Sequence, residues 1–140
     1  MSHETWDARY RKNPRLFSGR PNPTLVSETS HLPAGRRALD VGCGEGADAL
    51  WLVDHAWDVT ALDIAPTALQ RAARGESAGA GRVTWLEGDI TRDPPPSGPF
   101  DLLTMHYIPL LTTDADRVLP GLLETVAPGG TFLFVTHDIR

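Results

Sequence analysis

The chain has 140 residues, 41% hydrophobic and 22% charged, a composition typical of a single globular domain. Its formal net charge of −5 argues against a nucleic-acid-binding protein, because such proteins carry a clustered basic face. The single cysteine, Cys43, excludes an internal disulfide and a zinc site made of cysteines alone. His3, His31, His55 and His137 do not have the spacing of metal ligands, so we expect no metal site.

No segment of the sequence predicts export or membrane insertion. The first four residues contain no apolar run of the kind that a secretory signal needs. The longest apolar stretch, residues 102–111, is interrupted by His106 and Pro109 and is too short to span a bilayer. We therefore expect a soluble, cytoplasmic protein without a membrane or nucleic-acid partner.

The N-terminal part of the chain predicts two short helices joined by a turn-rich loop. The first covers residues 5–13 and places Trp6 and Tyr10 on one face, one turn apart. Pro14 should end this helix, because the residue before a proline avoids the helical conformation. A loop rich in glycine and proline follows, and a second helical pattern covers residues 24–32.

Residues 36–140 alternate between short apolar runs and helix-like segments. The runs lack polar alternation, which indicates strands buried on both faces of a parallel sheet. The expected strands are residues 38–41, 59–62, 83–86, 102–105 and 131–135. The expected helices are residues 47–55, 66–76 and 113–127, the last one kinked or split at Pro120. The pattern predicts one domain with a doubly wound α/β fold and a mostly parallel sheet, preceded by a helical segment over residues 1–35.

Polar residues lie at or just after the end of every expected strand. They are Asp40, Asp63, Asp89, His106, and His137 with Asp138. In an open parallel sheet the ligand crevice lies outside the carboxyl ends of the strands. Any one of these aspartates could be a helix cap or a turn residue. Together they predict one polar crevice at this edge of the sheet.

A glycine-rich loop, residues 40–46, lies directly between a strand and a helix. Its three glycines allow a ligand to approach the backbone closely, as in sites for dinucleotides and for S-adenosylmethionine. A pyrophosphate at a helix N-terminus would need positive charge, but residues 38–70 contain no lysine or arginine. Three carboxylates lie in the loop or the next turn: Asp40, Glu45 and Asp48. This pattern favours S-adenosylmethionine, with its ammonium and sulfonium, over NAD.

Two further carboxylates are candidates for nucleoside recognition. Asp63, at the tip of the second strand, can accept hydrogen bonds from both ribose hydroxyls. Asp89, at the tip of the third strand, can accept from the adenine amino group, with Ile64 and Ile90 on the two faces of the ring. The alternative for Asp89 is a turn residue that ends the strand.

Five segments resemble, in order and spacing, the successive motifs of class I S-adenosylmethionine-dependent methyltransferases, which have a Rossmann-like fold. They are residues 40–46 (DVGCGEG), 62–64 (LDI), 88–90 (GDI), 100–103 (FDLL) and 123–134. Near the N-terminus, WDARY and PNP resemble a bacterial subgroup similar to thiopurine and tellurite-resistance methyltransferases.

The resemblance implies S-adenosylmethionine as cofactor, with S-adenosylhomocysteine as product, and a small-molecule methyl acceptor. It implies that Asp63 holds the ribose, and that Asp89, Ile64 and Ile90 hold the adenine. Asp101 would be structural. The residues implied for the methionine part are Asp40, Gly42, Gly44 and Gly46, with Cys43 as a small loop residue and not a nucleophile.

Methyl transfer from a sulfonium mainly needs alignment of the nucleophile with the methyl group and exclusion of water. His106, followed by Tyr107 at the end of the fourth strand, is the candidate that deprotonates or orients the acceptor. The alternative is that His106 only lines the cofactor. Candidates for a lid or an acceptor site are Trp6, Tyr10, Phe17, Arg20 and Tyr107, with plain packing or solvation as the alternatives.

We expect an enzyme, a small-molecule methyltransferase. The alternatives are a cofactor-binding or assembly module without turnover, and an NAD-linked oxidoreductase, which the acidic loop disfavours. The sheet of the family that these motifs resemble has seven strands, whereas in this sequence only five residues follow the expected strand 131–135. That strand would be an exposed apolar edge, so we expect either a fragment of a longer protein or a homodimer paired through this edge.

Overall fold

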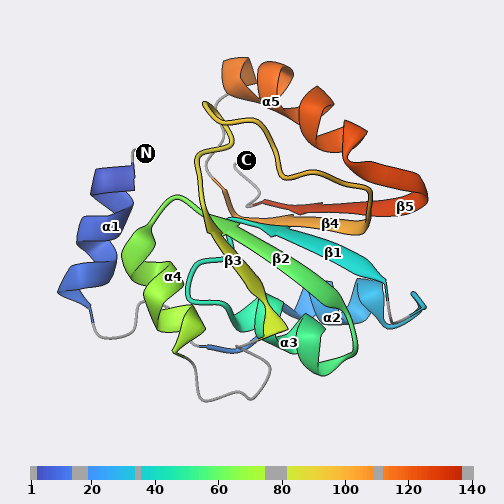
Figure 1. Ribbon diagram of the computed structural model, residues 1–140, viewed down its shortest axis with the longest axis horizontal. Helices are drawn as coiled ribbons and strands as arrows, with labels where there is room; N and C mark the ends of the chain where they lie inside the picture. The colour runs from blue at the N-terminus through green and yellow to red at the C-terminus, as the bar shows by residue number, and fades with distance from the viewer. Residues whose placement is uncertain (1–2, 14–18, 34–35, 75–81, 109–111, 137–140) are drawn as a thin grey trace.

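The computed structural model describes residues 3–13, 19–33, 36–74, 82–108 and 112–136 (Figure 1). Within them, five parallel strands form one sheet in the order β3-β2-β1-β4-β5. The strands are β1 (Arg37–Val41), β2 (Asp58–Asp63), β3 (Thr84–Glu87), β4 (Phe100–His106) and β5 (Val126–Val135). The helices are α1 (His3–Lys12), α2 (Pro23–Thr29), α3 (Ala47–Asp54), α4 (Pro66–Ala73) and α5 (Thr112–Glu124). The expected doubly wound α/β fold is confirmed.

Helices cover both faces of the sheet. Figure 1 shows α5 on one face and α2, α3 and α4 on the other. Leu25 of α2 and Leu52 of α3 belong to one apolar cluster with strand residues, while Val118 and Leu122 of α5 pack around Phe100 on the opposite face. Because both faces are covered, most residues of the central strands are apolar, as the sequence pattern indicates, with Asp40 and Thr104 as buried polar exceptions.

The central strand β1 is the point at which the strand order reverses. Asp40 of β1 lies in register with Ala61 of β2 on one side and with Thr104 of β4 on the other. Ligands of doubly wound sheets bind at the carboxyl ends of the strands near this point. Asp101 ties the start of β4 to that of β1, because it accepts hydrogen bonds from the Arg37 amide (3.0 Å) and the Arg36 guanidinium (3.1 Å).

Helix α1 does not belong to either layer and packs instead beside α4 (Figure 1). Tyr10 is buried there with Ala65 and Ala68, and Trp6 and Ile64 pack against this cluster. Tyr10 and Trp6 therefore lie next to the segment that follows β2, which is one wall of the expected crevice.

Two sequence expectations about the C-terminal part, a split of the last helix and the start of the last strand, are wrong. Helix α5 runs without a break through Pro120, so it is not split there. Burial of Val118 and Leu122 on either side of the proline stabilises the helix despite the missing amide donor. Strand β5 begins at Val126, five residues earlier than expected, because it pairs with Phe100 at the start of β4 and continues past a register shift.

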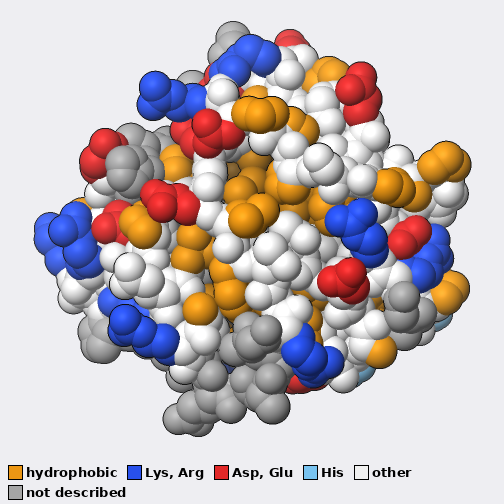
Figure 2. Space-filling view, viewed as in Figure 1, with side chains coloured by type: hydrophobic (Ala, Val, Ile, Leu, Met, Phe, Trp, Pro, Cys, Tyr) orange, Lys and Arg blue, Asp and Glu red, His pale blue; other side chains and the backbone are white. Residues whose placement is uncertain are grey.

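The two edges of the sheet are β3 and β5. Leu86 of β3 is 36% exposed and Phe134 of β5 is 39% exposed. Figure 2 shows apolar side chains gathered over and around β3, with charged side chains around them. No helix among the described residues is long and apolar enough to cross a membrane, and the same residues contain no group of side chains suited to a metal ion.

Candidate functional site

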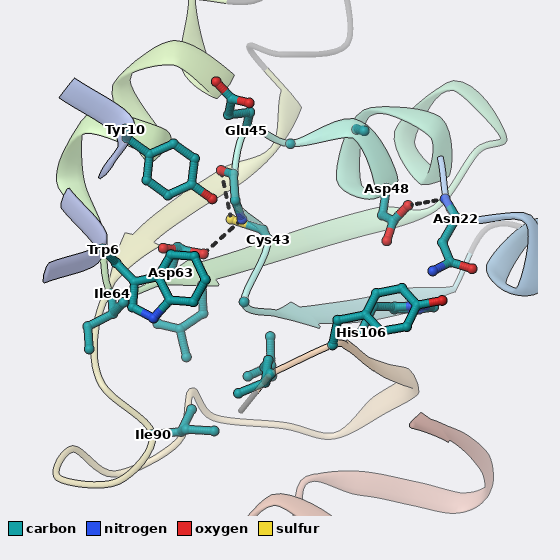
Figure 3. A pocket seen from close by; sticks show the side chains of 18 of the residues that line it. Trp6, Tyr10, Asn22, Cys43, Glu45, Asp48, Asp63, Ile64, Ile90 and His106 are labelled. Atoms are coloured by element: carbon teal, nitrogen blue, oxygen red, sulfur yellow. Dashed lines mark hydrogen bonds between the residues drawn. The ribbon is translucent and has the colours of Figure 1, made fainter. Parts of the chain in front are cut away.

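A cavity of about 790 Å³ opens at the carboxyl ends of the strands (Figure 3). Most of the predicted site residues line it: Trp6, Tyr10, Arg20, Gly42, Cys43, Gly44, Gly46, Asp63, Ile64, Asp89, Ile90, His106 and Tyr107. Asp40 lies at the end of β1 but is only 2% exposed and does not form part of the cavity wall. Phe17 lies outside the described residues. The structure thus brings together, in one cavity, residues that span a hundred positions of the chain.

Hydrogen bonds to the end of β2 hold the start of the glycine-rich loop in place. The amides of Gly42 and Cys43 both donate to the carbonyl of Leu62, at 2.7 and 2.9 Å. Gly44 has a φ of +56°, and a Cβ there would lie 3.1 Å from the Tyr10 hydroxyl. A side chain at this position would therefore both strain the backbone and fill the narrow space between the loop and α1.

Asp63 has a second role that the sequence did not suggest. Its carboxylate accepts hydrogen bonds from the amides of Gly44 and Ala65, both at 2.8 Å. Burial raises the pKa of Asp63, and these amide hydrogen bonds partly offset the shift. One side chain thus fixes the loop after β1 and the loop after β2 relative to each other. Each carboxylate oxygen has two lone pairs, so both can still accept a bond from a ribose hydroxyl.

A buried acidic pair lies beneath the loop. Asp40 has a carboxylate oxygen, Oδ2, with no hydrogen-bond partner among the described residues. Burial raises the pKa of Asp40 well above its ordinary value, and repulsion from Asp48 and Asp63 adds to the shift. Asp48 accepts a 2.7 Å hydrogen bond from the amide of Asn22, and burial raises its pKa too. A cation would relieve this unfavourable burial of negative charge, so the pair fits the ammonium of S-adenosylmethionine.

His106, at the end of β4, lies on the side of the cavity where Asp48 and Asn22 are (Figure 3). Its Nε2 lies 2.5 Å from the Thr104 hydroxyl, while Nδ1 is buried without a partner among the described residues. Burial lowers the pKa of His106, and the Asp48 carboxylate partly offsets this shift. The imidazole is therefore mainly neutral at pH 7, the form in which one ring nitrogen can accept a proton.

Asp89 forms the turn that was the alternative to its adenine role. Its Oδ1 accepts hydrogen bonds from the amide (2.9 Å) and the hydroxyl (2.6 Å) of Thr91. This local turn follows β3 and presents Ile90 to the cavity (Figure 3). Asp89 itself also lines the cavity, so the turn positions the residue without removing it from the site.

One of the three carboxylates expected to make the glycine loop acidic has a basic partner in the structure. Glu45 is not an unpaired negative charge, because it forms a 3.1 Å ion pair with Arg71 of α4. The sequence separation hid this pair, since α4 folds back beside the loop. The excess of negative charge at the site therefore comes from the buried Asp40 and Asp48.

Other predicted residues lie at the cavity wall in different environments. Tyr10 is 3% exposed, and burial raises its pKa far above the ordinary value. Burial also raises the pKa of the Cys43 thiol, which argues against a nucleophilic thiolate. Arg20 and Tyr107 are exposed at the cavity, and Tyr107 has a φ of +56°.

Sequence reasoning missed three residues of the site as such. Asn22 binds Asp48 and caps α2 by accepting from the amide of Thr24 at 2.9 Å, which is an ordinary helix-start pattern. Thr104 is a polar residue in the apolar strand β4, two positions before His106. Residues two positions apart lie on the same face of a strand, and this spacing could have indicated Thr104. Ile108 would collide with a side chain at Gly42, and no local pattern indicated it.

Comparison with known proteins supports a methyltransferase that uses S-adenosylmethionine. Residues 38–130 match the family model described as "Methyltransferase domain". The trans-aconitate 2-methyltransferase of Streptomyces avermitilis is 32% identical over 93% of this chain and 50% of its own length. An S-adenosylmethionine-dependent methyltransferase structure from Mesorhizobium loti has a TM-score of 0.66 and 30% identity, covering 80% of this chain and 50% of that one.

A TehB-like S-adenosylmethionine-dependent methyltransferase from Corynebacterium glutamicum has a TM-score of 0.67 at 20% identity, covering 94% of this chain and 71% of that one, which shows a shared fold. The chain spans about half the length of the curated relatives it matches. The matching family model, the strand order of the sheet and the glycine loop after β1 all indicate the same family. The chain belongs to the methyltransferase-domain family, with the Rossmann-like fold of class I S-adenosylmethionine-dependent methyltransferases.

Proposed function

We propose that this chain binds S-adenosylmethionine in the cavity at the strand ends and transfers its methyl group to a small-molecule acceptor. The observation that carries the proposal is the buried oxygen of Asp40 without a hydrogen-bond partner, next to Asp48 and beneath a glycine loop. The buried carboxylate of Asp40 and the half-buried carboxylate of Asp48, both with raised pKa values, favour a cationic ligand and disfavour the pyrophosphate of NAD. The relative named trans-aconitate 2-methyltransferase supports a small acceptor.

Different residues of the cavity would bind different parts of the cofactor. Asp40 and the loop glycines would hold the methionine part, Asp63 the ribose, and Ile64 and Ile90 the two faces of the adenine. Their place on the rigid ends of buried strands keeps the site preorganised. Bound S-adenosylmethionine supplies a methyl group that its sulfonium already activates for displacement.

Side chains near the methyl acceptor would exclude water from the cavity and accept the proton that the acceptor loses. Trp6 and Tyr10 of α1 form a lid over the cavity wall, and Arg20 and Tyr107 meet the acceptor at the open side. His106 lines the cavity and is mainly neutral, so it would orient a hydroxyl or amine acceptor, or accept its proton through a ring nitrogen that turns toward the cavity. An acceptor that reacts as a thiolate would not need this step.

The setting of the protein is also part of the proposal. We place residues 1–35 as the lid and acceptor segment and residues 36–140 as the cofactor-binding core of one domain, working in the bacterial cytoplasm. If β5 is also an edge of the sheet in the whole protein, its side, where Phe134 is 39% exposed, is the surface through which two copies would pair.

Calorimetric titration tests the cofactor assignment. S-adenosylhomocysteine should bind the wild-type chain and NAD should not. Asp40→Asn should weaken binding about tenfold or more, because it removes a buried negative charge behind the cavity wall that would attract the cofactor's ammonium, whereas Asp58→Asn, at the exposed start of β2, should not change it. Equal binding of NAD, or an unaffected Asp40 variant, would contradict the proposal.

Transfer of a radiolabelled methyl group to a panel of small acceptors tests the reaction. The panel should include carboxylic acids, phenols, thiols and amines. Transfer to any of them that fails with heat-denatured protein supports the enzyme. Tight cofactor binding with no transfer across the panel would favour a binding module without turnover.

A further inference from the structure

A single guanidinium on α4 contacts both the glycine loop and the N-terminal helix. Nη1 of Arg71 lies 3.1 Å from a carboxylate oxygen of Glu45, in the loop. Nη2 of the same side chain donates to the carbonyl of Tyr10, in the last turn of α1. The Arg71 and Glu45 side chains are 25% and 14% exposed, so the contact is more buried than an ordinary surface ion pair.

A second contact holds the same two helices one turn away. Asp7 of α1 accepts a 2.7 Å hydrogen bond from the amide of Thr67, in the first turn of α4. Asp7 and Tyr10 are one turn apart on α1, and Thr67 and Arg71 are one turn apart on α4. The two contacts therefore fix one face of α1 along one turn of α4, and Figure 1 shows the helices side by side.

Charge makes both contacts favourable in this orientation. Asp7 places a carboxylate at the positive N-terminal end of α4, and Arg71 places a cation at the negative C-terminal end of α1. Arginine can do this because its planar fork donates to two acceptors at once, whereas a lysine ammonium is a single point.

The position of α1 decides the shape of the cofactor cavity. Tyr10 is almost fully buried, and its hydroxyl would lie 3.1 Å from a Cβ at Gly44. Trp6, one turn earlier, also lines the cavity. Figure 3 shows the Tyr10 ring beside the glycine loop and the Trp6 ring beside Asp63 and Ile64, so docking of α1 on α4 places both rings at the cavity.

We propose that Arg71 is a positioning residue of the cofactor site: it fastens α1 to the glycine loop and so controls how tightly the site retains its ligand. The inference rests on the proposed function, because the ligand in question is the cofactor. Arg71 lies outside the cavity wall and acts through Glu45 and Tyr10, so it needs no contact with the ligand.

The test uses Arg71→Met, which keeps the aliphatic stem, and Arg74→Met as a control at the C-cap of the same helix, where the side chain is exposed. Hydrogen exchange of the ligand-free proteins should show residues 3–12 exchanging about tenfold faster in the Arg71 variant, with the central strands unchanged. Affinity for S-adenosylhomocysteine should fall about tenfold in the Arg71 variant and remain within about twofold in the control. Arg71→Lys should restore only part of the affinity.

A double variant separates this role from general stabilisation. Asp7→Ala should have a similar effect to Arg71→Met, and the two together should lose less affinity than the sum, because both act by releasing α1. Equal exchange of α1 and equal affinity in the Arg71 variant would overturn the inference while leaving the cofactor site intact. Failure of the wild-type chain to bind S-adenosylhomocysteine would instead overturn the proposed function, and the dependent statement about ligand retention with it.

Discussion

Replacing Asp63 by asparagine is the sharpest test of how the site is built. The carboxylate accepts two amide hydrogen bonds, from Gly44 and Ala65, each 2.8 Å long. In the asparagine variant, one oxygen becomes an NH₂ group that faces an amide donor, so at least one bond is lost. The ribose would also lose a charged acceptor, and because a hydrogen bond to a charged group contributes about 1.5–3 kcal/mol, the cofactor should bind about 1.5–3 kcal/mol more weakly.

The effect on stability should be smaller than the effect on binding. Burial raises the pKa of Asp63, which means that the folded chain holds the charged form at a cost. Removing the charge relieves that cost and offsets part of the lost hydrogen bonding. Affinity has no such compensation, because the ligand needs both the loop geometry and an acceptor oxygen for the ribose.

Titration with S-adenosylhomocysteine and thermal unfolding, both at neutral pH, measure the two effects. Asp58→Asn, on the exposed first residue of the same strand, is the control. A folded Asp63→Asn variant with wild-type affinity would refute the reasoning and remove Asp63 from the site. A large loss of stability with unchanged affinity would show that the residue is only a structural tie.

Three further outcomes are expected. Gly44→Val should abolish cofactor binding in titrations, because the φ of +56° and the Tyr10 hydroxyl leave no room for a branched side chain, and some loss of thermal stability should accompany it. The raised pKa of Asp40 means that the cofactor-free chain binds more protons folded than unfolded above pH 3.8, so its melting temperature should fall as the pH rises through the raised pKa. Asp40→Asn should flatten that pH dependence, and an unchanged slope would count against the assignment. The Cys43 thiol should react slowly with a disulfide reagent in the folded chain and rapidly in denaturant, because burial raises its pKa; fast reaction without denaturant is the contrary result.

The sequence predicted the fold because its strongest signals are local and repeated. Apolar runs without polar alternation are typical of strands covered on both faces, as β1 and β4 are, although the edge strand β3 proves largely exposed. The intervening helices carry ordinary start signals such as Pro66. The glycine loop and Asp63 were predicted for the same reason, since strand ends in a parallel sheet converge at one edge. Element ends were less certain: β5 starts at Val126 because of its pairing with β4, which no local pattern indicates.

Contacts between distant segments could not be predicted in this way. The Glu45–Arg71 pair overturned a count of charges along the chain, because charge balance at a site depends on which segments meet. The second role of Asp63, holding Gly44, and the contact of Asn22 with Asp48 depend on the same three-dimensional proximity. Sequence pattern identified the chemical groups, and packing decided which partners they have.

The spans of two hydrogen bonds described above set an order for folding. The Gly44–Asp63 bond closes a loop of 19 positions, whereas the Arg37–Asp101 bond that joins β1 to β4 spans 64. Closing a longer loop costs more chain entropy, so the unit from β1 to β2 should form before β4 adds to it. The ribose side of the cavity is then an early product of folding and the His106 side a late one. Pulse-labelled hydrogen exchange during refolding should show β1 and β2 protected before β4.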